Sequence, residues 1–191
     1  GSTLRLMGRL DDARVDLEKA AGMAGELGSA VLAALLESGP AQGASERGDH
    51  VAAKSRLESV LVVYRKHQQR VLEGHALLLL GGMNYFVDDL EAAQRCYEQA
   101  LAVHREVDDR IYECEALRGL ALVELELGRR GSARAHFVQA LEAIERVDER
   151  RWRPLTLGYF AILEQEEGEL RRATTLYLEA IAEARWGAGQ G

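Results

Sequence analysis

Apolar residues recur along this chain with the spacing of α-helices, and the same arrangement returns every 40 residues. Phe137 follows Ala133 by four residues, and Ala140 follows Ala133 by seven. This spacing places the three side chains on one helix face. Gly128 precedes this set. The same frame occurs at Gly8, Ala13, Leu17 and Ala20; at Gly48, Ala53, Leu57 and Val60; at Asp88, Ala93, Tyr97 and Ala100; and at Gly168, Ala173, Tyr177 and Ala180. Five copies at a constant period predict stacked helical repeats.

The residue that opens each copy indicates a tight turn before the helix that carries the alanine. Glycine reaches positive φ without the steric cost of a Cβ atom, so Gly128 and Gly168 suit such a turn. Asp88 stands at this position in the third copy, and Asp tolerates the conformation less well. Each copy is therefore expected to place a sharp turn between two helices.

The copies resemble the tetratricopeptide repeat family, whose units hold two antiparallel helices, A and B. The family's large residue and small neighbour in the middle of helix A are present as Leu80-Gly81, Leu120-Ala121 and Phe160-Ala161, and Leu77, Leu117 and Leu157 stand near its start. The resemblance implies an all-α fold, a right-handed α-solenoid of stacked antiparallel helix pairs. The period exceeds the family's usual length of about 34 residues, and the Pro after helix B is missing. Longer helices and a longer B-to-A connection are therefore expected, as in long-period units of bacterial multidomain regulators.

The frame predicts one repeat domain over residues 1–191, with repeats at 1–28 (incomplete), 29–68, 69–108, 109–148 and 149–191. Repeat two is irregular because Pro40 stands where Leu80 stands forty residues later. An interior Pro costs a helix about 3 kcal/mol or more, so helix A of this repeat is expected to kink or stop near Ser38. A hinge and a degenerate terminal repeat both explain the break. Beyond Glu183-Ala184 the pattern shows no capping helix, so either a continuing chain or another molecule is expected to cover helix B of repeat five.

Composition narrows the class of protein. The net charge of −7 argues against nucleic-acid or anionic-membrane surfaces, which need a basic face, and is compatible with a basic partner. The two cysteines, Cys96 and Cys114, form no CxxC motif and are too few for a disulfide framework, so a cytoplasmic protein is indicated. No apolar run reaches the roughly 20 residues of a membrane span, and no signal-peptide pattern is present.

Residues with catalytic chemistry form no recognisable constellation. The sequence contains no GxGxxG, GxxxxGK(S/T), HExxH or GxSxG motif. His136 and Cys96 share a repeat position, but equivalent positions on packed helices lie roughly 8–10 Å apart, too far for a dyad or a shared metal. Paired carboxylates, at Glu124 and Glu126 and again at Glu164, Glu166 and Glu167, are interpreted as a solvated face. No enzyme, cofactor or metal site is predicted.

The family resemblance implies a partner-binding groove on the concave face of the A helices. Its predicted lining is His75, Leu78, Gly82, Tyr85, Phe86, Glu115, Arg118, Leu122, Leu125, Glu126, Gly158, Ile162 and Glu166. Family members that clamp a C-terminal carboxylate use Lys and Asn at these positions, and only Arg118 fits, so a carboxylate clamp is not expected. Gly82, Gly119 and Gly158 are expected to leave room for an inserted chain, and Glu46, Glu126 and Glu166 to make the turn end acidic. Alternatively, the apolar members only pack the A helices together.

These observations predict a non-catalytic protein interaction or scaffold module of a larger bacterial regulatory protein. Its partner is expected to be a protein or peptide segment that is apolar in the middle and carries Lys or Arg at one end. The alternative is a self-assembly element that forms homo-oligomers through open repeat ends.

Overall fold

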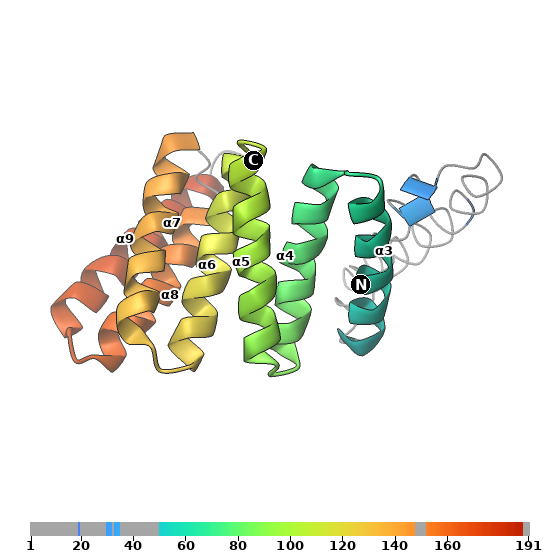
Figure 1. Cartoon of the computed structure of the whole chain (residues 1–191). Helices are drawn as coiled ribbons and strands as arrows, with labels where there is room; N and C mark the ends of the chain where they lie inside the picture. The colour runs from blue at the N-terminus through green and yellow to red at the C-terminus, as the bar shows by residue number, and fades with distance from the viewer. Residues whose placement is uncertain (1–18, 20–29, 32, 35–49, 148–151, 189–191) are drawn as a thin grey trace, which may run out of the picture. The chain divides into compact units, whose positions relative to one another are not determined.

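The computed structural model describes residues 19, 30–31, 33–34, 50–147 and 152–188 (Figure 1). Repeat one, the Pro40 break of repeat two and Glu46 lie outside this part. The chain divides into two compact units, residues 1–89 and 90–191. The described part contains no strand and holds the helices α3 (His50–Lys66), α4 (Arg70–Phe86), α5 (Leu90–Glu106), α6 (Arg110–Glu126), α7 (Arg130–Val147), α8 (Arg153–Glu166) and α9 (Leu170–Ala188).

The 40-residue period comes from long helices and short turns. Helices α3, α4, α5 and α6 each have 17 residues. Three residues separate consecutive helices at 67–69, 87–89, 107–109, 127–129 and 167–169, whereas residues 148–152 separate α7 from α8. The expectation of longer helices is confirmed. The expected longer B-to-A connection is wrong for 67–69 and 107–109, because the helices themselves take up the extra residues of the period.

Each turn has the same hydrogen bonds. At the end of α4, the Asp88 N–H donates to the Tyr85 carbonyl at 3.1 Å and the Asp89 N–H donates to the Asn84 carbonyl at 2.9 Å. This pair of bonds is the Schellman motif, whose central residue adopts positive φ. The central residues are Gln68 (φ 54°), Asp88 (62°), Asp108 (55°), Gly128 (71°) and Gly168 (81°). The predicted tight turns are confirmed, and the same motif also closes the B helices α3 and α5 without glycine.

In the first unit, α3 packs on α4. The face of α3 that the repeat frame predicts is buried, with Ala53 fully inaccessible and Leu57 and Val60 each 1% exposed. Leu77 and Leu80 are buried on α4. Two helices joined by a three-residue turn therefore form one antiparallel pair around an aliphatic core.

In the second unit, each of the helices α5 to α9 packs on the next in sequence (Figure 1). Ala133 and Phe137 of α7 are completely buried and form a cluster with Ala121, Phe160 and Leu163. The rings of Phe137 and Phe160 stack with centroids 5.6 Å apart. The predicted repeat phase is confirmed, and so is the all-α solenoid of stacked antiparallel helix pairs.

A search for membrane spans, limited to the described residues, finds no helix that is both long and apolar enough to cross a bilayer.

Candidate functional site

The exposed face of α6 and α8 in the second unit carries most of the predicted partner-binding residues. Leu122 and Leu125 are half-buried on α6 and pack, together with Tyr159 of α8, against the Phe137 cluster. Part of each leucine therefore belongs to the core. The part that remains accessible forms an apolar floor.

On α8, two apolar residues are exposed to solvent. Leu155 is 44% exposed and Ile162 is 39% exposed. Gly158 lies between them, and a Cβ atom built on it would meet no atom within 4 Å. Residues 155, 158 and 162 share one helix face by their spacing. The predicted clearance at Gly158 is therefore present, next to exposed apolar side chains.

Gly119 does not offer the same room, so its predicted clearance is wrong. A Cβ atom at this position would lie 2.5 Å from Cε1 of Tyr97. The Tyr97 ring, from α5, already fills the space beside the Gly119 backbone. The glycine serves close helix packing, not an inserted chain.

Arg118 is held by neighbours on this face. Its guanidinium lies 3.8 Å from the Glu115 carboxylate and 5.3 Å above the ring centroid of Trp152. Cation–π contacts of this geometry are favourable, most of all with Trp. The side chain braces α6 against the start of α8. Sequence reasoning missed Trp152 because nothing local connects two residues 34 positions apart.

The turn end of the face is less acidic than predicted. Glu126 and Glu166 are exposed. The Glu166 carboxylate lies 3.6 Å from the Arg130 guanidinium, and both side chains are about half exposed. Arg130 therefore offsets part of the negative charge of Glu166 at this edge.

The predicted residues on α4 belong to the first unit and are described separately. Leu78 is only 6% exposed, so it acts mainly as a core residue. His75, Gly82 and Tyr85 are half-buried. Phe86 is 64% exposed and meets Tyr85 edge to face. On this helix, Phe86 offers the largest accessible apolar surface among the predicted residues.

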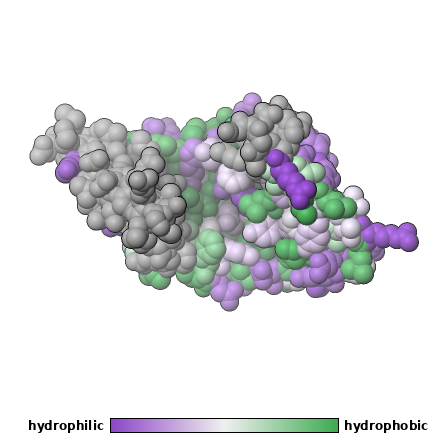
Figure 2. All heavy atoms as spheres, turned by 180° about the vertical axis from the view of Figure 1, so that it is seen from behind, coloured by the Kyte–Doolittle hydropathy of each residue, from purple (hydrophilic) through white to green (hydrophobic). Residues whose placement is uncertain are grey.

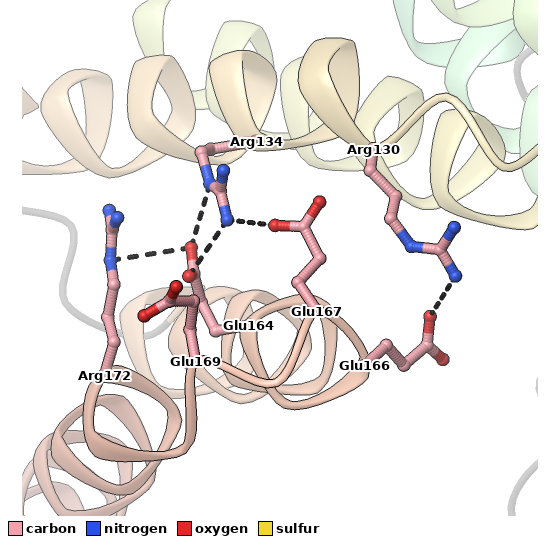
Figure 3. Close-up of a pocket in the computed structure, with 7 residues that line it drawn as sticks. All are labelled: Arg130, Arg134, Glu164, Glu166, Glu167, Glu169 and Arg172. Atoms are coloured by element: carbon pink, nitrogen blue, oxygen red, sulfur yellow. Dashed lines mark hydrogen bonds and ion pairs between the residues drawn. The ribbon is translucent and has the colours of Figure 1, made fainter.

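A polar cavity of about 720 Å³ lies at the turn between α8 and α9 (Figure 3). It is lined by Arg130, Arg134, Glu164, Glu166, Glu167, Glu169 and Arg172. Arg134 donates two hydrogen bonds of 3.0 Å to Glu164 and a further one to Glu167. The hydrogen bond to Glu164 raises the pKa of Arg134 above its usual range. Arg172 approaches Glu164 to 3.5 Å.

The solvated face predicted for the paired glutamates is wrong at two positions. Glu164 is 0% exposed and Glu124 is 7% exposed, whereas Glu126, Glu166 and Glu167 are exposed as expected. The two buried carboxylates point toward the B helices, where basic side chains meet them. The charges of the cavity are therefore largely matched within the fold, so the cavity serves structure.

His136, which shares a repeat position with Cys96, pairs with Glu124 instead. Its Nδ1 lies 2.7 Å from the Glu124 carboxylate. The pair links the two helices of one repeat, since Glu124 belongs to α6 and His136 to α7. Cys96 and Cys114 are buried and are not joined in a disulfide.

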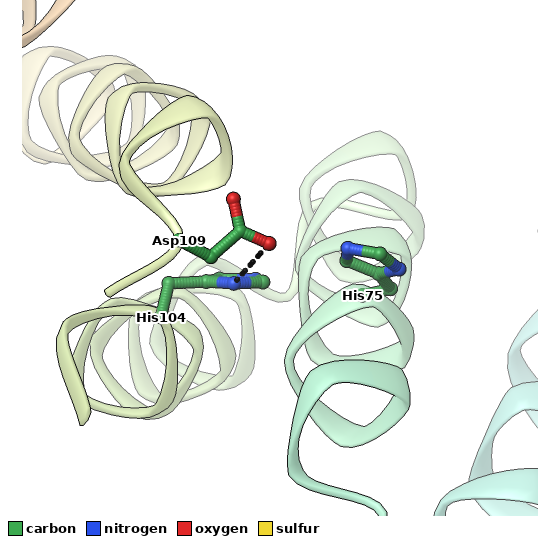
Figure 4. Close-up of side chains that lie close together, drawn as sticks. All are labelled: His75, His104 and Asp109. Atoms are coloured by element: carbon green, nitrogen blue, oxygen red, sulfur yellow. Dashed lines mark ion pairs between the residues drawn. The ribbon is translucent and has the colours of Figure 1, made fainter. Parts of the chain in front are cut away.

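His104 joins the end of α5 to the start of α6 (Figure 4). Its ring is fully buried and stacks on Tyr112, with centroids 5.4 Å apart. Nδ1 lies 3.6 Å from the carboxylate of Asp109, which also caps α6 by accepting the Tyr112 N–H. This carboxylate therefore supports both the helix start and the histidine. The arrangement fixes the turn between the two helices.

Hydrophobic residues gather only in small groups on the molecular face that Figure 2 shows. Hydrophilic residues separate these groups.

Comparison with known proteins identifies the type of repeat in this fold. The sequence profile of the tetratricopeptide repeat matches residues 72–146, which span most of α4 to α7. Residues 72–146 are tetratricopeptide repeats. Helix α3 before this stretch and the pair α8 and α9 after it keep the same repeat positions. No curated protein matches the sequence.

Solved structures share the fold at low sequence identity. BtubC (BKLC) from P. vanneervenii has a TM-score of 0.77 and 18% identity, over 92% of this chain and 74% of that one. Aspartyl phosphate phosphatase F from Bacillus subtilis has a TM-score of 0.84 and 12% identity, over 96% of this chain and 50% of that one. A putative kinesin light chain with TPR-like repeats from Podosopora anserina has a TM-score of 0.74 and 15% identity, over 95% and 90%. Tetratricopeptide repeats thus occur here in an arrangement found in proteins of different kinds.

Proposed function

We propose that this chain is a non-catalytic protein interaction module that holds a partner segment on the face of α6 and α8. Tetratricopeptide repeats generally serve as scaffolds for protein and peptide partners. The observation that carries the proposal is the exposed pair Leu155 and Ile162 beside the open backbone of Gly158. A segment laid along this face would bury apolar area, at about 25 cal/mol per Å².

The charges nearby suggest the chemistry of the segment. Glu126 and Glu166 are exposed at the turn end of the face, and the Arg130 guanidinium lies 3.6 Å from the Glu166 carboxylate. A Lys or Arg at one end of the segment would complement this edge. Exposed charge pairs contribute only about 0–1 kcal/mol each, so the glutamates would mainly set orientation and association rate.

The predicted residues on α4 extend the proposal to the first unit. Phe86 and Tyr85 on α4 would offer apolar surface of that unit's own. We also infer that the module belongs to a larger bacterial regulatory protein of the cytoplasm. The buried thiols Cys96 and Cys114 are compatible with a reducing compartment.

Peptide selection from a phage-displayed random library tests the proposal. Peptides that bind the parent protein should be apolar in the middle with Lys or Arg at one end. Ile162→Asp should weaken their binding at least tenfold at any salt concentration. Val138→Asp is the matched control, because Val138 is 37% exposed against 39% for Ile162 but lies on α7. Equal binding by the Ile162→Asp protein would move the site away from α8.

The charged edge is tested separately. Glu126→Lys combined with Glu166→Lys should slow association at low salt and matter little near 1 M salt, where screening acts within about 3 Å. If the double variant binds as the parent does at low salt, the proposed basic end of the segment is wrong while the apolar site can stand.

Self-assembly through the repeat ends is the second candidate function. Light scattering of the parent protein over a wide concentration range separates the two functions. A constant monomer mass would exclude the assembly function, and a mass that rises with concentration would favour it.

A further inference from the structure

The last described helix, α9, exposes a strip whose apolar positions are buried or half-buried in the earlier B helices. The strip comprises Ala180, Ile181, Ala184 and Arg185. Ile181 is 49% exposed. Residues at its repeat position in earlier copies are Leu61 (7% exposed), Leu101 (9%) and the half-buried Leu141.

The residues at the position of Ala184 show the same contrast. Tyr64 is 2% exposed, His104 0% and Ile144 1%, whereas Ala184 is exposed. Not every apolar residue of α9 follows this rule. Leu178 is 63% exposed, and its equivalent Val138 is exposed as well, so that position faces outward in both copies.

The same kind of element covers the strip in all three earlier copies. Helix α4 packs on α3, α6 packs on α5, and α8 packs on α7. In each case the covering element is the following helix A. The structure thus contains three internal examples of what fits this surface.

An ion pair joins the two helices at each of these seams. Arg65 of α3 lies 2.9 Å from Glu73 of α4, and Arg105 of α5 lies 2.8 Å from Glu113 of α6. At the third seam the charges are exchanged, with Glu145 of α7 lying 3.5 Å from Arg153 of α8. Arg185 of α9 occupies the repeat position of Arg65 and Arg105. A helix that covers the strip is therefore expected to carry an acidic residue in its first turn, where it would pair with Arg185.

The covering helices α4 and α6 share a sequence pattern, which describes the kind of helix that fits the strip. After the first-turn Glu, Leu follows at four residues and again at seven, a small residue at eight and an apolar residue at ten. In α4 these are Glu73, Leu77, Leu80, Gly81 and Met83, and in α6 they are Glu113, Leu117, Leu120, Ala121 and Val123. All ten are buried except Glu113, which is half-buried.

We propose that the strip of α9 docks an amphipathic α-helix of a partner protein with this pattern, acidic in its first turn. Charge favours such a partner over a second α9. Arg171 and Arg185 are exposed on α9, and a second copy packed helix to helix would bring these like charges together. The inference is independent of the α6 and α8 face, because it uses a different helix and different residues.

Fluorescence anisotropy with a labelled peptide tests the docking. The probe is a synthetic peptide with the sequence of residues 109–127, which contains the pattern, carrying Cys114→Ser to prevent oxidation. The parent 191-residue protein should bind it saturably. Ile181→Asp should weaken binding at least tenfold, because a charge would enter the buried seam.

Leu178→Asp is the matched control and should bind the peptide as the parent does. Ile162→Asp should also bind it normally, which separates this surface from the proposed segment site. Circular dichroism melts verify that all three variants stay folded. This check is informative because each substituted side chain is at least 39% exposed in the parent.

A charge exchange tests the ion pair. Arg185→Glu should weaken binding several-fold at low salt, and a peptide with Glu113→Arg should recover it, as the exchanged pair at Glu145 and Arg153 indicates. Failure of the parent to bind the peptide, or equal binding by Ile181→Asp, would overturn the proposal. Self-association of the parent that Ile181→Asp abolishes would assign the strip to a second copy and also overturn it.

Discussion

Arg134 of α7 holds the carboxylate of Glu164 of α8 with two parallel hydrogen bonds, each 3.0 Å long (Figure 3). Glu164 is completely buried, and the Arg134 side chain is 33% exposed. Bidentate pairs of this kind are among the stronger polar contacts in proteins. The pair couples repeat four to repeat five and satisfies a carboxylate that burial would otherwise penalise.

Removing Arg134 should therefore destabilise the fold. Arg134→Leu leaves Glu164 buried with Arg172 at 3.5 Å as the remaining base, and breaking a buried pair costs about 3–5 kcal/mol. Arg130→Leu is the control, because its pair with Glu166 is about half exposed and is expected to contribute about 0–1 kcal/mol. Urea unfolding of the two variants measures the difference. Equal midpoints would show that Glu164 is satisfied without Arg134.

The contribution of Arg134 should be independent of pH near neutrality. Its pKa is raised in the folded state, so the protonated form is favoured by folding. Stabilisation from such a group is complete below the unfolded pKa and is lost only as the pH rises through the raised folded pKa, far above neutrality. The difference in unfolding free energy between the parent and Arg134→Leu should stay constant from about pH 7 to about pH 10. A loss within that window would point to another titrating group.

The repeat phase predicts opposite packing defects at two buried positions. Phe137→Ala removes a ring that stacks on Phe160 and should cost about 3–5 kcal/mol through the cavity it leaves. Ala133→Leu adds volume at a site with no accessible surface and should cost about 1–3 kcal/mol. Denaturant midpoints at the parent's value for both variants would contradict the assigned core.

Two helical glycines should respond to alanine with opposite signs. At Gly119 the new methyl group would lie 2.5 Å from the Tyr97 ring, which must shift at a cost on the order of 1–3 kcal/mol. At Gly158 the methyl group would meet nothing, so Gly158→Ala should stabilise the helix by about 0.5–1 kcal/mol. Thermal melts followed by circular dichroism compare the two. A stabilised Gly119→Ala protein would mean that the Tyr97 ring moves aside freely.

The turn between α6 and α7 offers a matched pair of a different kind. Gly128 has φ of 71°, and Ala at this position should cost about 1–2 kcal/mol although no atom lies within 4 Å of the added Cβ. Gly131 has the same free space but lies within α7 at negative φ, so Gly131→Ala should be neutral or stabilise by up to about 1 kcal/mol. Calorimetric unfolding of both variants isolates the backbone effect from packing. If the two variants changed the unfolding free energy equally, the positive φ of Gly128 would not account for the cost of replacing it.

The sequence alone determined the helices, their phase and the tight turns at Gly128 and Gly168. Helical periodicity is a local property, and five copies at one spacing report the same face repeatedly, so the burial of Ala133 and Phe137 follows from the sequence pattern. The expected longer connection from helix B to helix A was wrong at two turns, where residues other than glycine adopt positive φ. The connections of residues 67–69 and 107–109 form the same motif without glycine, because the fold supplies enough contacts to hold Gln68 and Asp108 at positive φ.

Only the tertiary structure decided which charged and small residues face a neighbouring helix. Glu164 and Glu166 are two residues apart in the same acidic run, yet one is fully buried and the other exposed. Glu164 meets Arg134, thirty residues away in sequence, and the space beside Gly119 is likewise filled by Tyr97 of another helix. Periodicity gives the direction of a side chain around its own helix, whereas the identity of what it meets depends on how separate helices pack.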